Sequence, residues 1–185
     1  LFGLEDKKEV SFFNVEKIAL KGLGSAEAIE GIKSTHNVLE THGLRSIDHL
    51  LYVVLDQEFN LSSHVGIPVN GIIGYQFLRK NLIEINYQKK KIIVYQNKEK
   101  RRVKIEKKFK KIPISIERNK PYITTDMELE TTTIKAKLLI DIGNSDALWL
   151  FQNLSKEIQI PFKNFVDYLG QGFSGGVFGK RAKLT

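Results

Sequence analysis

Short runs rich in Ile, Val, Leu, Phe and Thr recur along the chain between turn residues. Short runs of this kind bounded by turn residues are typical of β-strands. The clearest predicted strands are Leu50–Leu55, Leu82–Tyr87, Lys91–Tyr95, Ile112–Ile116, Tyr122–Leu129 and Ile134–Ile140. The polar segment Gln88-Lys89-Lys90 separates the second run from the third, so we expect these two strands to pair as a hairpin.

Helical patterns are few and short. One covers Tyr75–Lys80 and begins at Gly74–Tyr75, directly after a glycine. Another lies near Leu150–Ile158 and is stopped by Pro161, because proline cannot continue a helix. The pattern as a whole predicts an all-β chain with minor helices.

The length of 185 residues fits one or two small domains with a buried core. A hydrophobic content of 42% and a charged content of 27% are those of a soluble globular protein. No apolar run reaches the length of a membrane span, and no signal-peptide pattern opens the chain. The chain does not begin with Met, so we expect a trimmed N-terminus. With no cysteine there is no disulfide or thiolate site, and the redox compartment cannot be inferred.

The net charge of +8 comes from one segment. Residues 89–111 hold 12 Lys or Arg against two Glu, whereas the remainder carries 17 basic and 19 acidic side chains. Such a run can bind nucleic acid or an anionic surface. Only Tyr95 and Phe109 could stack on bases within it, so we favour a solvated hairpin and linker and expect no nucleic-acid partner.

A weak internal repeat has an offset of about 148 residues. Leu1-Phe2 corresponds to Leu150-Phe151, and Leu23-Gly24 corresponds to Leu169-Gly170. Each match is weak by itself, but their order and near-constant spacing favour two related units.

Residues 138–145 join an apolar strand to an Asp-Xaa-Gly turn. A carboxylate at the end of a buried strand is costly to place, and the tight turn needs glycine. Two such aspartates can share one proton and activate a water between them. The alternative for the bare pattern is an ordinary β-turn with a solvated aspartate.

In this context the chain resembles the retropepsin-like aspartic peptidases, especially the two-lobed bacterial form often followed by a PDZ domain. Each lobe of that family carries a strand ending in Asp-Thr/Ser-Gly, a flap hairpin, and a later apolar-apolar-Gly turn that opens a short helix. The active-site turn of the second lobe is similar to Asp141, Ile142, Gly143, Asn144 and Ser145. The apolar-apolar-Gly support of the first lobe is similar to Gly71, Ile72, Ile73 and Gly74.

The resemblance implies pepsin/retropepsin-like acid-protease β-barrel lobes with short helices. Residues 1–97 would be the C-terminal part of the first lobe, 98–111 a basic linker, and 112–185 the N-terminal part of the second lobe. The chain is therefore expected to be a fragment, with the partner aspartate about eight residues before Leu1 by the internal repeat.

The resemblance also implies an aspartic endopeptidase that acts on polypeptides, with Asp141 as a catalytic residue and no cofactor or metal. Flaps would come from Ile29–Glu40 and Gly170–Lys180. An extracytoplasmic location, periplasmic or secreted, is expected, and a homodimer is left open. By itself the fragment is expected to be inactive, since it supplies one aspartate of the required pair.

One departure from the family favours an alternative. Ile142 occupies the position of the usual Thr or Ser, whose hydroxyl braces the two catalytic turns. Its absence favours a catalytically weak or inactive relative that keeps the cleft for binding peptides. Ser145 could still hydrogen-bond the carboxylate of Asp141, and Asn144 tolerates unusual backbone angles.

Other motifs carry less weight. Residues 172–176 fit Gly-Xaa-Ser-Xaa-Gly around Ser174, but no helix follows and all four histidines precede it, so a glycine-rich strand bordering a flap is favoured. The histidines lack the spacing of a zinc site. Trp149 is interpreted as a core aromatic residue.

Overall fold

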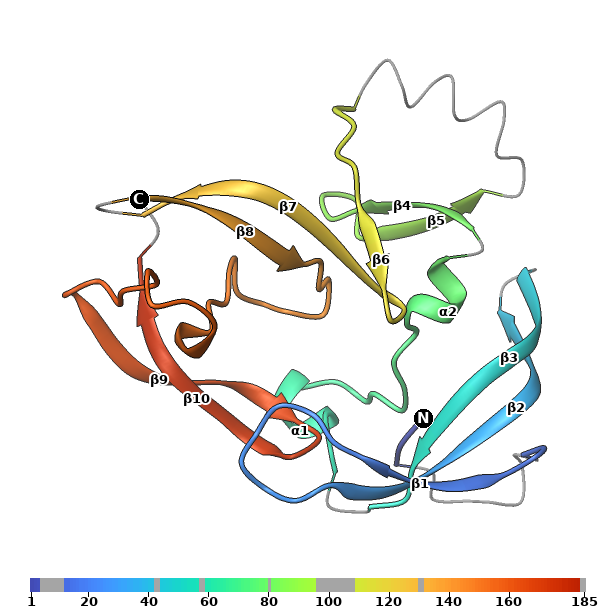
Figure 1. Ribbon diagram of the computed structural model, residues 1–185. Helices are drawn as coiled ribbons and strands as arrows, with labels where there is room; N and C mark the ends of the chain where they lie inside the picture. The colour runs from blue at the N-terminus through green and yellow to red at the C-terminus, as the bar shows by residue number, and fades with distance from the viewer. Residues whose placement is uncertain are drawn as a thin grey trace. The chain divides into compact units, whose positions relative to one another are not determined.

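The computed structural model describes residues 1–3, 12–41, 44–56, 59–79, 81–95, 109–129 and 132–183. Strands make up 48% of the structure and short helices 7%, which confirms the prediction of an all-β chain (Figure 1). The chain divides into two compact units. Unit 1 contains Leu1–Phe77 and Phe162–Thr185, and unit 2 contains Leu78–Pro161.

Unit 1 contains an antiparallel sheet of three strands in the order β1-β2-β3. These are β1 (Glu16–Leu20), β2 (Ile29–Thr41) and β3 (Leu44–Val54). The pairing of β2 with β3 shifts register on both sides of Asn37. Two non-glycine residues beside these shifts, His36 and Asp48, adopt left-handed backbone angles, with φ of 59° and 57°. Such bulges bend a hairpin and increase its twist.

A buried polar network supports the bend in the β2–β3 hairpin. The hydroxyl of Ser34 is fully buried, donates to the carbonyl of Phe13 at 2.7 Å and accepts from the Phe13 N–H at 3.1 Å. The same hydroxyl lies 3.1 Å from Oδ1 of Asn37, whose amide donates to the carbonyl of His49 at 3.0 Å. Buried polar groups with partners of this kind fix one register and are costly to leave unpaired.

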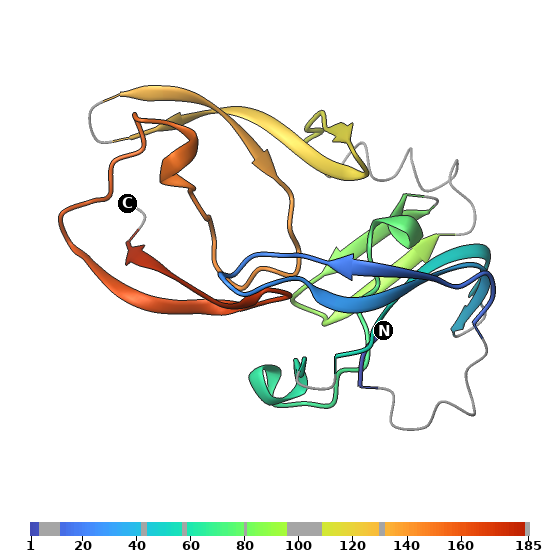
Figure 2. The same cartoon turned by 60° about the horizontal axis from the view of Figure 1, so that its bottom comes forward.

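The C-terminal hairpin also belongs to unit 1. It consists of β9 (Asn164–Gly172) and β10 (Gly175–Ala182), with Phe173-Ser174 as its turn. Figure 2 shows the tip of this hairpin against the loop that precedes β2. The backbone of Ser174 accepts from the N–H of Ala26 at 2.8 Å and donates to the carbonyl of Leu23 at 3.3 Å.

The buried position of Ser174 rules out an exposed nucleophilic hydroxyl. Its side chain is fully buried, and its Oγ accepts from the N–H of Gly22 at 3.3 Å. Gly24 lies directly against this turn, with φ of +119°, and a Cβ there would come within 2.1 Å of the Ser174 carbonyl oxygen. The glycine is therefore required both by its backbone angle and by the close approach of the hairpin.

Aromatic side chains make the core of unit 1. Phe2, Val54 and Phe59 are all at least 90% buried and pack together. The ring of Phe59 meets that of Phe2 edge-on at 5.3 Å between centroids and that of Phe173 at 5.0 Å. Because Phe173 lies in the turn of the C-terminal hairpin, this cluster joins residues that are far apart in the sequence.

Unit 2 contains two small antiparallel sheets. The first is the hairpin of β4 (Leu82–Asn86) and β5 (Lys91–Tyr95), which confirms the predicted pairing. The second has the order β6-β7-β8, with β6 (Ser115–Glu117), β7 (Lys120–Glu128) and β8 (Thr133–Leu139). Ile112–Ile116 was expected to be a strand, but pairing begins only at Ser115. Pro113 lacks the N–H that a strand at 112–114 would need for its ladder.

The helices are as short as expected. The helices are α1 (Ser62–Val65), α2 (Tyr75–Leu78) and the 3-10 turn η1 (Gln152–Leu154). The start of α2 at Tyr75 confirms the predicted position. The predicted helix near Leu150–Ile158 is reduced to η1, because Ser155 is extended and its hydroxyl accepts from the N–H of Glu157 at 3.2 Å. No helix among the described residues is long and apolar enough to cross a membrane.

Most of the expected linker, residues 98–108, lies outside the described residues. Phe109, Lys110 and Lys111 are described and exposed. The lobe boundaries expected from the sequence stay a prediction, whereas the two compact units are a division by packing.

Candidate functional site

The aspartate turn begins where the sheet of unit 2 ends. β8 pairs with β7 as far as Leu139, and the N–H of Ile140 donates to the carbonyl of Pro121 at 2.9 Å. Asp141 is therefore the first residue after the hydrogen-bonded part of this strand. The side chain of Asp141 is exposed. Its Oδ1 accepts the backbone N–H of Gly143 at 2.9 Å. A carboxylate that accepts from the N–H two residues on closes an Asx turn, which fixes its direction relative to the strand.

Gly143 allows this approach. A Cβ at this position would lie 3.3 Å from Oδ1 of Asp141, so any side chain would press on the carboxylate. Ile142 is 51% exposed and has no hydrogen-bonding side chain. Ser145, which the sequence offered as a possible donor to the carboxylate, is exposed, and in the described structure the hydrogen bond comes from Gly143.

A second Asx turn follows the first, and the sequence analysis missed it. Oδ1 of Asn144 accepts the N–H of Asp146 at 2.9 Å, and Oδ2 of Asp146 accepts the indole N–H of Trp149 at 2.7 Å. The half-buried indole thus holds the chain after the aspartate turn through a charged hydrogen bond, rather than only as core. The sequence does contain a signal for both turns, because Asp141 and Asn144 each lie two residues before the N–H that they accept.

The apolar-apolar-Gly segment of unit 1 lies against the first residues of the chain. The N–H of Phe2 donates to the carbonyl of Asn70 at 3.0 Å, and the amide of Asn70 donates to the carbonyl of Gly3 at 3.3 Å. A Cβ on Gly71 would lie 2.9 Å from Cδ2 of Leu1. On its other side, the carbonyl of Leu1 accepts the N–H of Val54 from β3 at 2.8 Å. Residues 1–3 are therefore held between β3 and residues 70–71.

The two isoleucines of this segment are exposed. Ile72 has 65% and Ile73 58% of its surface accessible. The carbonyl of Gly74 accepts the N–H of Phe77 at 3.1 Å and opens α2. Phe77 is 5% exposed and anchors the helix.

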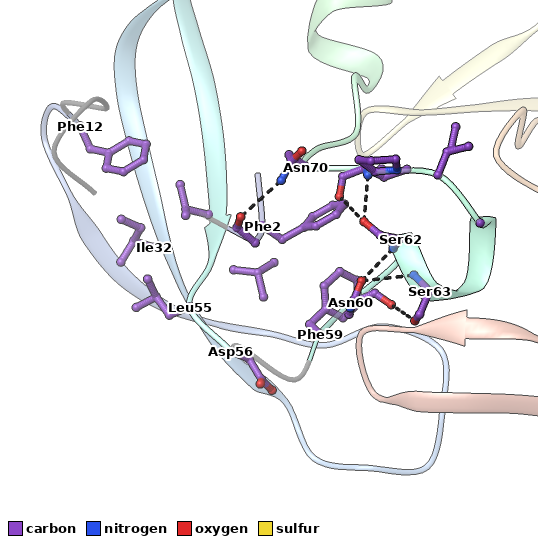
Figure 3. Close-up of a pocket in the computed structure, with 17 residues that line it drawn as sticks. Phe2, Phe12, Ile32, Leu55, Asp56, Phe59, Asn60, Ser62, Ser63 and Asn70 are labelled. Atoms are coloured by element: carbon purple, nitrogen blue, oxygen red, sulfur yellow. Dashed lines mark hydrogen bonds between the residues drawn. The ribbon is translucent and has the colours of Figure 1, made fainter. Parts of the chain in front are cut away.

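A cavity of about 980 Å³ lies in unit 1 beside the core (Figure 3). Its apolar wall includes Phe2, Ile32 and Phe59. Several of its polar atoms are occupied by the fold. Oδ1 of Asn60 accepts the N–H groups of residues 62 and 63 at 2.9 and 3.3 Å, and Oγ of Ser62 bonds both the N–H and the carbonyl of residue 69. The lining thus combines this apolar wall with polar groups that bond within the fold, and it also includes the Asp56 carboxylate.

Within the described ranges, no group of three His, Cys, Asp or Glu side chains is placed to hold a metal ion. His36 instead pairs with Asp48, with 2.7 Å between Nδ1 and Oδ1, on the exposed side of the β2–β3 bend.

The predicted site residues fall in different units. Asp141–Ser145 belong to unit 2, and Gly71–Gly74 belong to unit 1 together with residues 1–3. The structure therefore places the aspartate turn next to the end of β8, and the segment Gly71–Gly74 next to residues 1–3. No protein-family model, curated protein or solved structure matches the chain.

Proposed function

We propose that this chain is part of an aspartic endopeptidase in which Asp141 is one of two catalytic carboxylates. The observation that carries the proposal is the exposed Asp141 side chain at the end of β8, oriented by the N–H of Gly143. The hydrogen bond engages Oδ1 and leaves Oδ2 without a protein donor among the described residues. A fixed carboxylate with one oxygen available is the half-site that such a mechanism needs.

Peptide hydrolysis requires a second carboxylate facing the same water. When two carboxylates lie close together, they share one proton, because both cannot ionise at that distance. The ionised carboxylate takes a proton from the water, and the oxygen of that water attacks the peptide carbonyl carbon. The protonated carboxyl gives its proton to the carbonyl oxygen. Collapse of the tetrahedral intermediate breaks the C–N bond, and a proton passes to the leaving nitrogen.

The 185 residues contain one Asp-Xaa-Gly sequence, at Asp141. We therefore propose that the second aspartate is joined to the chain before Leu1. The packing of Leu1 against Gly71 supports this proposal, because it brings the first described residue to the segment Gly71-Ile72-Ile73-Gly74. In the aspartic peptidases that the sequence resembles, the corresponding apolar-apolar-Gly segment supports the catalytic turn of its lobe.

Extended polypeptide is the proposed substrate. An extended chain can add backbone hydrogen bonds to exposed strand edges. Flaps that exclude water from the reaction were expected at Ile29–Glu40 and Gly170–Lys180. The first of these segments lies in the β2–β3 hairpin. The second carries the Phe173-Ser174 turn, which is packed in unit 1 with Ser174 fully buried, so we do not propose it as a flap.

Ile142 favours a second candidate, a peptide-binding relative with weak or no catalysis. The side chain at this position has no hydroxyl, so it cannot provide the hydrogen bond that braces the two turns in the resembled family. In this case the cleft would bind peptides without hydrolysing them.

A cleavage assay separates the two candidates. An unfolded protein is incubated at pH 4–7 with the 185-residue chain and, in parallel, with the chain extended by the residues encoded before Leu1. We expect turnover only from the extended chain. Saturable binding of the unfolded protein by the extended chain without any turnover would support the binding module. Turnover by the monomeric 185-residue chain would contradict the requirement for a second aspartate.

A further inference from the structure

We propose that the β4–β5 hairpin of unit 2 docks on an anionic lipid surface through its tip. The tip, residues 87–90, is a defined turn rather than a loose loop. Oδ1 of Asn86 accepts the N–H of Lys89 at 2.9 Å, and the N–H of Lys90 donates to the carbonyl of Tyr87 at 3.2 Å. Lys90 has φ of 49°, which closes the turn in the left-handed region. The backbone of the turn is therefore closed by its own hydrogen bonds at the end of the β4–β5 hairpin (Figure 1).

Three consecutive lysines lie at this tip. Lys89, Lys90 and Lys91 are all exposed. In the part of the chain that the structure describes, none of their ammonium groups forms an ion pair. Lys89 and Lys90 in the tip and Lys91 at the start of β5 thus carry an uncompensated charge of +3. They lie at the start of residues 89–111, which carry 12 Lys or Arg against two Glu.

One face of the same hairpin is apolar. The register places Ile83 opposite Val94 and Ile85 opposite Ile92, and successive residues of a strand alternate between its faces. These four side chains therefore share a face. Ile92, the nearest to the tip, is 67% exposed, and Tyr87 in the turn is 75% exposed.

The combination of exposed apolar, aromatic and lysine side chains matches the chemistry of a lipid interface. Tyrosine rings favour the headgroup level of a bilayer, and aliphatic side chains gain from partial burial in it. Lysines near an anionic leaflet each raise binding about fivefold. Single-stranded nucleic acid fits less well, because it binds on a series of stacking aromatic rings, and the tip offers Tyr87 alone.

The test measures binding of the 185-residue chain to vesicles of neutral phosphatidylcholine and to vesicles containing anionic phosphatidylglycerol. We expect binding to the anionic vesicles only, and weaker binding as salt rises, because screening shortens the range of the lysine charges. Lys89→Gln, Lys90→Asn and Lys91→Gln are combined, with Asn chosen because it tolerates left-handed angles. This variant should bind about a hundredfold more weakly.

The matched control removes three exposed lysines elsewhere, by Lys21→Gln, Lys156→Gln and Lys163→Gln. It has the same net charge as the hairpin variant and should keep most of the binding. Equal losses in both variants would reduce the effect to net charge and overturn the assignment to the hairpin. If the hairpin variant bound vesicles as tightly as the unchanged chain, the membrane contact would lie at other basic residues, and the assignment to the hairpin would be overturned.

The absence of cysteine allows the docked residue to be identified directly. An environment-sensitive dye attached through Gln88→Cys at the tip should report transfer to an apolar medium when anionic vesicles are added. The same dye on Gln159→Cys, also an exposed glutamine of unit 2, should not. Binding of a single-stranded oligonucleotide that depends on the three hairpin lysines, without any vesicle binding, would identify nucleic acid as the partner and refute the lipid proposal.

Discussion

Replacement of Phe59 by alanine should strongly destabilise unit 1. The Phe59 side chain is 8% exposed and contacts the rings of Phe2 and Phe173, with centroid distances of 5.3 and 5.0 Å. Truncation of a buried phenylalanine typically costs about 3–5 kcal/mol, because it removes buried apolar surface and leaves a cavity. The two ring contacts contribute about 0.5–1.5 kcal/mol each to such a loss.

Urea unfolding followed by far-UV circular dichroism measures this loss. With a urea dependence of about 2 kcal/mol per molar, a cost of about 4 kcal/mol moves the midpoint down by about 2 M. Phe162→Ala is the matched control, since the Phe162 side chain is 99% exposed. The control should change the free energy of unfolding by less than about 0.5 kcal/mol.

The contact between Phe59 and Phe173 can be isolated by a double-mutant cycle. Because the two rings touch, the double variant should be more stable than the sum of the single effects predicts, by about 0.5–1.5 kcal/mol. Strict additivity would mean that the C-terminal hairpin does not pack on the core through these rings. Equal effects of Phe59→Ala and Phe162→Ala would refute the placement of the core itself.

Three further predictions follow from single contacts. Gly24→Ala should cost more stability than Gly66→Ala in thermal unfolding: both glycines have positive φ, but only the new Cβ at Gly24 would collide with the hairpin turn. Ser34→Ala should cost about 1–3 kcal/mol in urea unfolding, since it leaves buried partners unpaired; a cost below about 0.5 kcal/mol would contradict the buried network. The hydrogen bond from Lys137 lowers the pKa of Glu117, so this pair stabilises the fold above the unfolded pKa and loses its effect as pH falls through the folded pKa. Lys137→Gln should raise the pKa of Glu117 in a carboxyl NMR titration, and an unchanged pKa would disprove the pairing.

Local patterns in the sequence predicted most of the strands. The β4–β5 hairpin was predictable because two apolar runs flank a short polar segment, so the two strands that pair are neighbours in the sequence. Where the prediction failed, a local competitor was overlooked. Pro113 delays the start of β6, and the hydroxyl of Ser155 competes with helix formation after η1.

Contacts between distant residues could not be predicted in the same way. The turn at Phe173-Ser174 packs on residues 22–26, and no periodicity in either segment indicates the other. The glycine pattern around Ser174 indicated a flexible strand, but the approach of Gly24 became apparent only from the fold.

The candidate site shows the same division. Asp-Xaa-Gly predicted the turn at Asp141, because an Asx turn depends on residues two positions apart. Ser145 was considered as a possible donor, whereas the carboxylate accepts from the nearer N–H of Gly143. The hydrogen bond between Asp146 and Trp149 was missed because Trp149 was interpreted as a core residue and Asp146 was given no role. The second carboxylate remains a prediction, because the 185 residues contain one Asp-Xaa-Gly sequence.

The most direct test of the proposed function is turnover of an unfolded protein by the chain extended before Leu1, with and without Asp141→Asn. The substitution keeps the shape of the side chain and removes its ability to exchange a proton, so turnover should fall by about 10²–10⁴-fold. Asp126→Asn on the exposed face of β7 is the matched control and should leave turnover unchanged. Turnover that survives Asp141→Asn would contradict the proposal, because it would remove Asp141 from the mechanism.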